Sequence, residues 1–593
     1  MSKESGHKLT LSDIDEVATK ITGMYTKYNQ QRATALLLGQ EVRNFIFATD
    51  IDSTTSGNLD TSNRTHIPKL TELSDTLQSN YWETIFGDEN FFIFTGETSE
   101  DRARAKKIEA WIRTKLASKK FRETEGRKLV ADFVIYGNCF INVDFIVERD
   151  DTNDIVFKGC TLKRVSPLSI VFDAEAETFD KSPKIRKSTI HIADLAELAH
   201  KYPNANYKAG LIKKILKTRE ASNRSDWVEM LHKENFEMDG FGSYEAYLQQ
   251  DYVEVLTYRG DVYDSKTGKI QKHRIIEVVD GLHVIRNEAN PSPVGMSGIH
   301  HIACRTRPDN LWGMGLLDGL AGMQYRVNKV ENLKADVMDA IAHPIVIHRG
   351  GNALNKISDI YRPGEFIDLD EDETLEFERP DANILRYADS HMDAYFTLME
   401  NFAGATPQER GIRTPGEKTA AEVRSLDSKG SKLFKDKAKI FEAGLESALK
   451  EAFELTLKQF DGVDYMEIFD DEEGLTMLQE LSKEDINARG SFTAVGSKHW
   501  DVKNKRKTEL SQILAQVLAE PGLKAHSNGW QICKAIEEIY QIDDMGIFER
   551  YRGVKDDVQL QAIAQAEGEQ LNQQLEQSAQ VQQQQGGGFP QPQ

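Results

Sequence analysis

The chain has 593 residues, of which 39% are hydrophobic and 28% are charged, so it is long enough for about four domain-sized units with sizeable cores. Its 74 Lys and Arg residues stand against 95 Asp and Glu residues, a formal net charge of −21. This balance argues against a protein that grips nucleic acid through many phosphate contacts, although DNA could still slide past such a surface without sticking.

The first part of the chain is predicted to be helical. Apolar residues at helical spacing predict helices over 11–47, 67–86, 100–116 and 121–136. The segment 50–64 is rich in Ser, Thr, Asn, Asp and Gly, and we expect a mobile loop there. Gly137 and Asn138 are typical of a helix end, so the fourth helix should stop before them.

The apolar period then changes from helical to alternating. Residues 139–147 alternate apolar and polar side chains, which is typical of a half-buried strand. Further strands are expected over 155–162, 168–172, 252–263, 271–279 and 282–286. Asp280 and Gly281 between two apolar runs are a strong hairpin signal. We therefore expect two small antiparallel β units embedded among helices.

Two helices with narrow apolar stripes are predicted next, over 311–341 and 383–402. Such stripes suit packing of one helix against another. Between them, 344–380 should hold short strands and turns, including an acidic segment at 368–378.

The longest predicted helix covers 414–460. Thr414 as N-cap, Pro415 in the first turn and Glu417 three residues on form a capping box with a proline start. An unbroken helix of this length would span about 65 Å, although Gly430 and Gly444 weaken that expectation. A helix this long suits a rod, a bundle or one spoke of a large assembly.

The C-terminal part is expected to contain two shorter helices, over 505–518 and 531–539. From about residue 558 the chain becomes rich in Gln. We interpret 558–580 as a polar helix and 581–593 as disordered.

The cellular setting is inferred from cysteines and apolar runs. The chain has four scattered cysteines without paired spacing, which indicates a reducing compartment without a disulfide framework. The first ten residues are polar and do not resemble a signal peptide. Asp132, Asn138, Asn142 and Asp144 interrupt the apolar run 129–147, so no transmembrane helix is expected. We therefore expect an intracellular, soluble protein.

No motif in the sequence predicts a catalytic or cofactor site. The sequence GEKT at 416–419 lacks the glycine spacing of a phosphate-binding loop, and the capping box explains it better. Glycines also cluster near the start of the predicted helix 311–341, without the spacing of a dinucleotide-binding loop. We interpret them as sites of close helix packing: Gly313, Gly315, Gly319 and Gly322.

Two groups of residues could be metal ligands, and both have a simpler interpretation. Asp368, Asp370 and Asp372 alternate as calcium ligands do, but the later loop positions do not match an EF-hand, so a solvated acidic loop is favoured. His300, His301 and Cys304 have no second ligand pair nearby in sequence. They are more simply explained as ordinary strand-end residues.

The loop 403–418 joins two predicted long helices and carries Arg410, Arg413 and Lys418 beside Glu409 and Glu417. Loop composition alone favours a solvated connector. In a ring of copies, such a loop would point into a shared lumen.

The order of these elements over about 60–540 resembles the portal proteins of tailed bacteriophages, especially the larger short-tailed-phage type. FVIYGNCF at 133–140 is similar to the family's helix–Gly–strand junction, and RVSPLSIVFDAEA at 164–176 to a segment of its wing. RPDNLWGMGLLDGLAGMQYRVNKVEN at 307–332 resembles the start of its first stem helix. KTAAEV at 418–423 resembles the helix start after its channel loop.

The resemblance implies an α+β fold, mainly α, divided into wing, stem, clip and crown. The implied parts are the N-terminal helices and wing (1–310), stem helix 1 (311–341), clip (342–382), stem helix 2 (383–402), tunnel loop (403–417), long wing helix and return strands (418–504), crown (505–557) and Gln-rich tail (558–593). It also implies DNA-channel loop residues, namely Gln408, Glu409, Arg410, Arg413 and Lys418.

The resemblance further implies a dodecameric ring at one capsid vertex, present in the virion and assembled in the host cytoplasm. Double-stranded DNA would pass through it without sequence readout. The implied partners are the terminase large subunit, a tail adaptor, and the major capsid or scaffolding protein. No enzymatic activity, cofactor or membrane is implied, and the packaging ATPase should be a separate protein.

Two other functions remain open from the sequence. The first is another helical virion protein, an internal or tail component without a DNA channel. The second is a metal-dependent nuclease that uses Asp368, Asp370 and Asp372, for which the ligand geometry is missing.

Overall fold

The computed structural model describes residues 11–47, 63, 65–149, 155–201, 206–219, 230–241, 243, 252–264, 268–293, 295–343, 345–349, 374–404, 420–460, 464–470 and 475–496. The chain divides into two units, and every described residue lies in the first, which spans 1–470 and 475–497. The helices expected over 505–518 and 531–539, and the Gln-rich tail, lie outside the described residues. The described part is a mixed α+β fold.

The four predicted N-terminal helices are confirmed. They are α1 (Leu11–Phe47), α3 (Lys69–Phe86), α4 (Ser99–Ser118) and α5 (Arg127–Ile135). One correction concerns the fourth, because a π-helical turn at Arg122–Gly126 precedes α5. A capping box starts α4: the Thr98 hydroxyl accepts from the Asp101 N–H at 3.2 Å, and the Asp101 carboxylate accepts from the Thr98 N–H at 3.2 Å.

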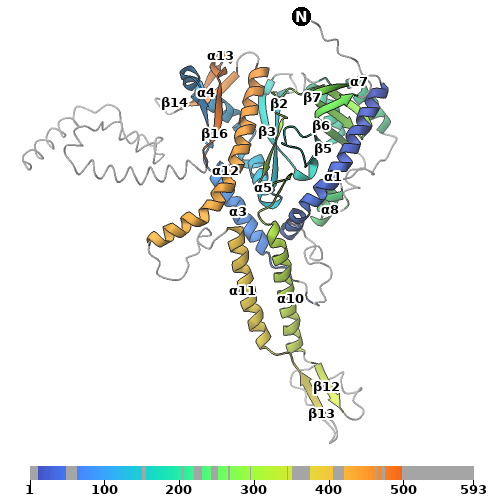
Figure 1. Cartoon of the computed structure of the whole chain (residues 1–593), viewed down its shortest axis with the longest axis vertical. Coiled ribbons are helices and arrows are strands. Elements are labelled where there is room, and N and C mark those ends of the chain that lie inside the picture. Colours follow the sequence, from blue (N-terminus) through green and yellow to red (C-terminus); the bar gives the residue numbers. More distant parts are fainter. Residues whose placement is uncertain are drawn as a thin grey trace, which may run out of the picture. The chain divides into compact units, whose positions relative to one another are not determined.

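Two antiparallel sheets make up most of the β structure (Figure 1). The three-stranded sheet has the order β3-β2-β9, with β2 (Asn138–Arg149), β3 (Ile155–Val165) and β9 (Ile299–Ala303). The five-stranded sheet runs in the order β4-β5-β6-β7-β8, with β4 (Ile170–Phe172), β5 (Lys184–His191), β6 (Tyr252–Asp264), β7 (Lys269–Val279) and β8 (His283–Ala289). The hairpins were predicted, whereas β5 and β9 were not.

Shorter elements complete the β structure and cover it. The two-stranded sheets pair β1 (Phe92–Gly96) with β16 (Gly490–Ala494), β10 (Arg305–Arg307) with β11 (Asn310–Met314), β12 (Ile345–Arg349) with β13 (Thr374–Glu378), and β14 (Asp464–Asp470) with β15 (Leu475–Leu481). The remaining short helices are α6 (Ile192–Lys201), α7 (Ala209–Arg219), α8 (Met230–Met238) and α13 (Lys483–Ile486). None of the helices in the described residues is long and apolar enough to cross a membrane.

The largest core lies where α12 (Ala420–Gln459) packs on the three-stranded sheet and on α3. The helix has 40 residues and is continuous through Gly430 and Gly444. Gly444 is required there because a Cβ at this position would lie 2.3 Å from the Ile302 side chain on β9. The predicted capping residues Thr414, Pro415 and Glu417 lie outside the described residues.

The predicted helix 311–341 is wrong over its first ten residues. These residues instead form most of β11 and a 3-10 turn at Asp318–Leu320, and α10 begins only at Ala321 (Ala321–Ala342). Gly313 approaches another backbone rather than a helix: its N–H donates to Asn138 Oδ1 at 2.7 Å, and an added Cβ would lie 2.8 Å from the Gly137 carbonyl oxygen. The interpretation of Gly313 as a helix-packing site is therefore wrong. It is also wrong for Gly319 and Gly322, where an added Cβ would meet no atom within 4 Å.

The second helix of this pair is confirmed as α11 (Asn383–Ala403), and Gly404 ends it with a φ of +75°. Helices α10 and α11 lie side by side and lead to the β12–β13 hairpin (Figure 1). This hairpin agrees with the short strands expected in 344–380, while 350–373 lie outside the described residues.

Candidate functional site

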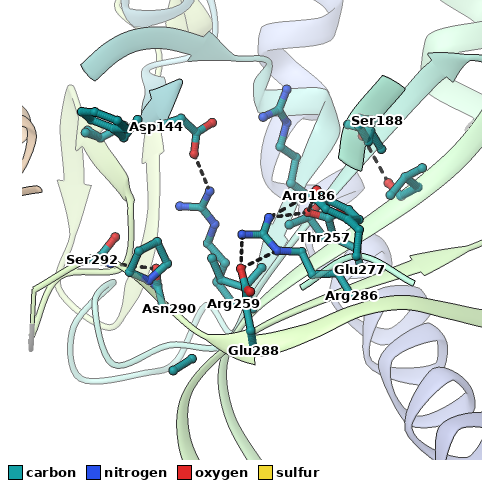
Figure 2. A pocket seen from close by; sticks show the side chains of 18 of the residues that line it. Asp144, Arg186, Ser188, Thr257, Arg259, Glu277, Arg286, Glu288, Asn290 and Ser292 are labelled. Atoms are coloured by element: carbon teal, nitrogen blue, oxygen red, sulfur yellow. Dashed lines mark hydrogen bonds and ion pairs between the residues drawn. The ribbon is translucent and has the colours of Figure 1, made fainter. Parts of the chain in front are cut away.

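A polar pocket of about 390 Å³ lies between the three-stranded and the five-stranded sheets (Figure 2). Strands β2, β5, β6, β7 and β8 contribute most of its lining, and α12 contributes Leu455 and Gln459. Six charged side chains face it: Asp144, Arg186, Arg259, Glu277, Arg286 and Glu288. Three are cationic and three anionic, so the pocket has no surplus charge to attract an ionic ligand.

Ion pairs join these side chains across the pocket, as the dashed lines in Figure 2 show. Arg259 Nη2 lies 3.2 Å from Asp144 Oδ1, and this contact links β6 to β2. Arg286 on β8 pairs with Glu277 at 2.9 Å and also with Glu288. The Tyr207 hydroxyl donates to Glu277 at 2.9 Å.

The charge states in the pocket are set by these pairs. Burial alone would raise the pKa of Asp144, but the guanidinium groups of Arg259 and Arg186 outweigh it and hold that pKa below its ordinary value. Burial would lower the pKa of Arg286, but Glu277 and Glu288 raise it further above its usual range. Asp144 and Arg286 therefore stay charged near neutral pH, and we interpret the ion pairs as a polar contact that links the two sheets.

The histidine and cysteine residues considered as metal ligands do not converge. His300 and His301 are neighbours on β9, and their side chains have different partners. The His300 ring lies 2.5 Å from the Glu451 carboxylate on α12, whereas His301 Nε2 lies 3.0 Å from Asn138 Oδ1. Cys304 is a buried free thiol, as are Cys139 and Cys160. Within the described ranges, no group of three or more His, Cys, Asp or Glu residues could hold a metal ion.

His301 lies in an aromatic cluster that makes its protonation costly. Its ring stacks on Phe140 at 4.6 Å and lies within 5.6 Å of Phe172 and Phe179. Asn138 Oδ1 also accepts the Gly313 N–H, so it is an acceptor and His301 carries its proton on Nε2. Burial lowers the pKa of His301 to about 3.

We expect acid to destabilise the fold through His301. In the unfolded chain the imidazole titrates near pH 6.5, whereas in the folded chain it stays neutral down to about pH 3. Between these two pH values protons bind the unfolded chain more strongly, so the free energy of unfolding falls as the pH falls. His301 keeps some solvent contact, so we expect a loss on the order of 2–4 kcal/mol. His301→Phe should flatten the pH dependence of the urea midpoint between pH 6.5 and 4, and the same change at the exposed His283 should not. Equal slopes in the wild type and His301→Phe would contradict this.

Helix α11 carries two apolar stripes, and only one of them is covered. The covered stripe includes the buried Met392, Met399 and Ala403. The second stripe, called here the outer stripe, is offset by about one residue and is solvent-exposed; it comprises Ile384, Tyr387, Ala394, Leu398 and Phe402. Tyr387 is 77% exposed and Phe402 is 60% exposed.

The neighbouring helix α10 also has exposed apolar side chains. Leu333 and Met338 are 43% and 53% exposed. Lys334 on α10 pairs with Asp389 on α11 at 2.7 Å, an ion pair between the two helices. An apolar patch of this kind, rimmed by polar residues, commonly marks an interaction surface.

Sequence reasoning missed a second feature of α10, a row of buried amides. Gln324, Asn328 and Asn332 are at most 1% exposed, and all three bond the backbone of residues 65–70. Amide residues repeating every four positions on one helix face were the available signal. Polar residues in a helix ordinarily face solvent, so this repeat does not by itself predict burial.

The predicted DNA-channel residues Gln408, Glu409, Arg410, Arg413 and Lys418 lie outside the described residues. In the sequence they fall between the end of α11 and the start of α12. The possible calcium ligands Asp368, Asp370 and Asp372 also lie outside the described part of the chain.

Comparison with known proteins adds no assignment. No family model matches this chain, and no curated protein matches it in sequence.

Proposed function

We propose that this chain is a portal protein of a tailed bacteriophage. Copies would pack side by side into a closed ring at one capsid vertex, and double-stranded DNA would pass through the ring during packaging and ejection. In this proposal α10 and α11 form the stem, and the β12–β13 hairpin belongs to the clip. The clip would dock the terminase large subunit and later the tail adaptor.

The observation that carries the proposal is the outer stripe of α11. Five apolar positions along a 21-residue helix face solvent in the single chain, and burying a large apolar side chain contributes about 1.5–3 kcal/mol. The covered stripe already packs within the chain, so in the proposed ring the surface that covers the outer stripe would come from a neighbouring copy. Contacts between two unlike surfaces of identical chains close into a ring when the rotation between copies permits it.

Charge and chemistry support a conduit. A net charge of −21 lowers the affinity of a channel wall for phosphates, since tight binding depends on many cations. A few cations on a loop, such as Arg410, Arg413 and Lys418, would contact the DNA backbone without reading sequence. Five of the six charged groups of the described pocket form ion pairs with one another, which supports a structural role for the pocket.

The test is the mass and shape of the purified full-length chain, measured by mass photometry and negative-stain microscopy. We expect a closed ring with a central hole and a mass near twelve times 67.1 kDa, about 805 kDa. A neighbouring ring size would still support the proposal. A monomer at every concentration, or an open filament, would contradict it and favour another helical virion protein.

A further inference from the structure

The buried amides of α10 lie along a segment far upstream in the sequence. Four α10 side chains each accept one backbone N–H from this segment. The pairs are Leu70 N–H to Gln324 Oε1 (3.2 Å), Ile67 N–H to Asn328 Oδ1 (3.2 Å), Thr65 N–H to Asn332 Oδ1 (2.6 Å) and Asn63 N–H to Asp336 Oδ1 (3.0 Å). Two amides also donate back: Gln324 Nε2 to the Ile67 carbonyl at 2.5 Å, and Asn332 Nδ2 to the Thr65 carbonyl at 3.2 Å.

The spacing of these contacts has a geometric cause. Residues 63, 65 and 67 meet positions 336, 332 and 328, so two residues of the segment match four residues of the helix, in antiparallel order. Two residues of extended chain advance about 6.6 Å, and four helical residues advance about 6.0 Å. An extended backbone can therefore follow an amide row at i, i+4 and i+8 as it would follow a neighbouring strand.

The contact with His66 is consistent with one orientation of the Asn328 amide. Because Asn328 Oδ1 accepts from the Ile67 N–H, its Nδ2 must donate to His66 Nδ1 at 3.0 Å. The His66 ring is therefore neutral, and it stacks on Phe45 of α1 at 5.8 Å. Burial lowers the pKa of His66, although the Phe45 carbonyl partly offsets that effect.

The same segment also holds α11. Lys69 is 8% exposed, and its ammonium lies 2.8 Å from Glu400 on α11 and 2.7 Å from Glu72 on α3. It also lies over the Phe396 ring of α11 at 5.4 Å. One short segment thus contacts both helices of the pair, just before α3 enters the core with Leu70 and Leu73.

We propose that Asn63 and residues 65–70 form a clasp that holds α10 and α11 to the body of the fold by backbone recognition, with Gln324, Asn328 and Asn332 as its positioning residues. The clasp sets the local stability of α10 beyond Val327, the last α10 residue of the main core. The amides of α10 bond backbone groups of the clasp. The clasp therefore needs the Thr65 N–H but does not need the exposed Thr65 side chain. The clasp is a contact within one chain, and it does not depend on whether copies of the chain form the proposed ring.

A matched pair of variants separates backbone from side chain at one position. Thr65→Pro removes the N–H that Asn332 accepts, whereas Thr65→Ala keeps it. In full-length protein we measure hydrogen–deuterium exchange by mass spectrometry. Thr65→Pro should lower protection across 328–342 about tenfold or more, while Thr65→Ala and the protection of β2 and β3 stay at wild-type values. Equal protection in the two variants would overturn the clasp.

A double-mutant cycle tests whether the helix side of the contact is the amide row. Asn332→Leu should lose protection as Thr65→Pro does, and the double variant should lose no more than either single variant, because both remove the same contact. If the double variant instead lost protection by the product of the two single factors, Asn332 would not be the partner of the Thr65 N–H. If Asn332→Leu does not fold, Asn332→Ala takes its place, because it removes the same amide that accepts the Thr65 N–H. Hydrogen–deuterium exchange measures local stability within each chain, whereas mass photometry measures ring assembly. The clasp and the ring are therefore tested by separate results.

Discussion

Changing Tyr387 and Leu398 to Glu is expected to abolish ring assembly while leaving each chain folded. Both side chains are exposed on the outer stripe of α11 and contact no core in the single chain. In the proposed ring they would be buried against the neighbouring copy, with a gain of about 1.5–3 kcal/mol each. The change removes that gain and adds the cost of burying an unpaired carboxylate. We therefore expect association at each interface to weaken by a factor of about 100 or more.

The measurement is mass photometry of both proteins at equal concentration, with circular dichroism to verify the helical content. Leu37→Glu is the control, because Leu37 is a 58% exposed leucine on another helix, α1. The control should assemble as the wild type does. Rings formed equally well by the Tyr387/Leu398 variant would show that the outer stripe is not the contact between copies, and the function proposed from it would lose its main support.

Replacing Gly137 by Ala is expected to destabilise the fold by about 4 kcal/mol or more. Gly137 has a φ of +65°, a conformation that costs other residues roughly 1–2 kcal/mol. An added Cβ would also lie 2.1 Å from the Met314 carbonyl carbon and oxygen and 2.3 Å from the Gly315 nitrogen. These are backbone atoms in the β10–β11 hairpin region, so no side-chain rotation relieves the overlap.

The check is urea unfolding of the variant beside Gly23→Ala. Gly23 lies inside α1, and an added Cβ there meets no atom within 4 Å. Ala at that position should raise stability by about 0.5–1 kcal/mol, since it reduces the entropy of the unfolded chain. Similar midpoints for the two variants would mean that the backbone near Met314 adjusts freely, contrary to the close approach described above.

Elements that depend on contacts close in the sequence were predicted, and elements that depend on contacts distant in the sequence were not. Helices α1, α3, α4 and α11 were predicted because apolar spacing and capping residues act within a few turns. Strand β9 was missed because IHHIA is short, and its pairing partner β2 lies about 160 residues earlier. The start of α10 was misplaced for a related reason. Residues 310–314 have a helix-compatible pattern, but pairing with β10 and the close contact of Gly313 with Gly137 impose a strand.

The sequence by itself determined most of the element types, because these follow from periodicity along a single segment. It also predicted a pair of helices with a strand-containing connection between them. Tertiary structure alone decided which polar residues are buried and which apolar residues are exposed. Asn328 is buried against the backbone of Ile67, which lies 261 residues away in the sequence. The outer stripe of α11 is exposed because α10 and α3 cover only the opposite face of that helix. Burial is a property of the neighbours that a residue acquires on folding, and for this chain those neighbours come from distant parts of the sequence.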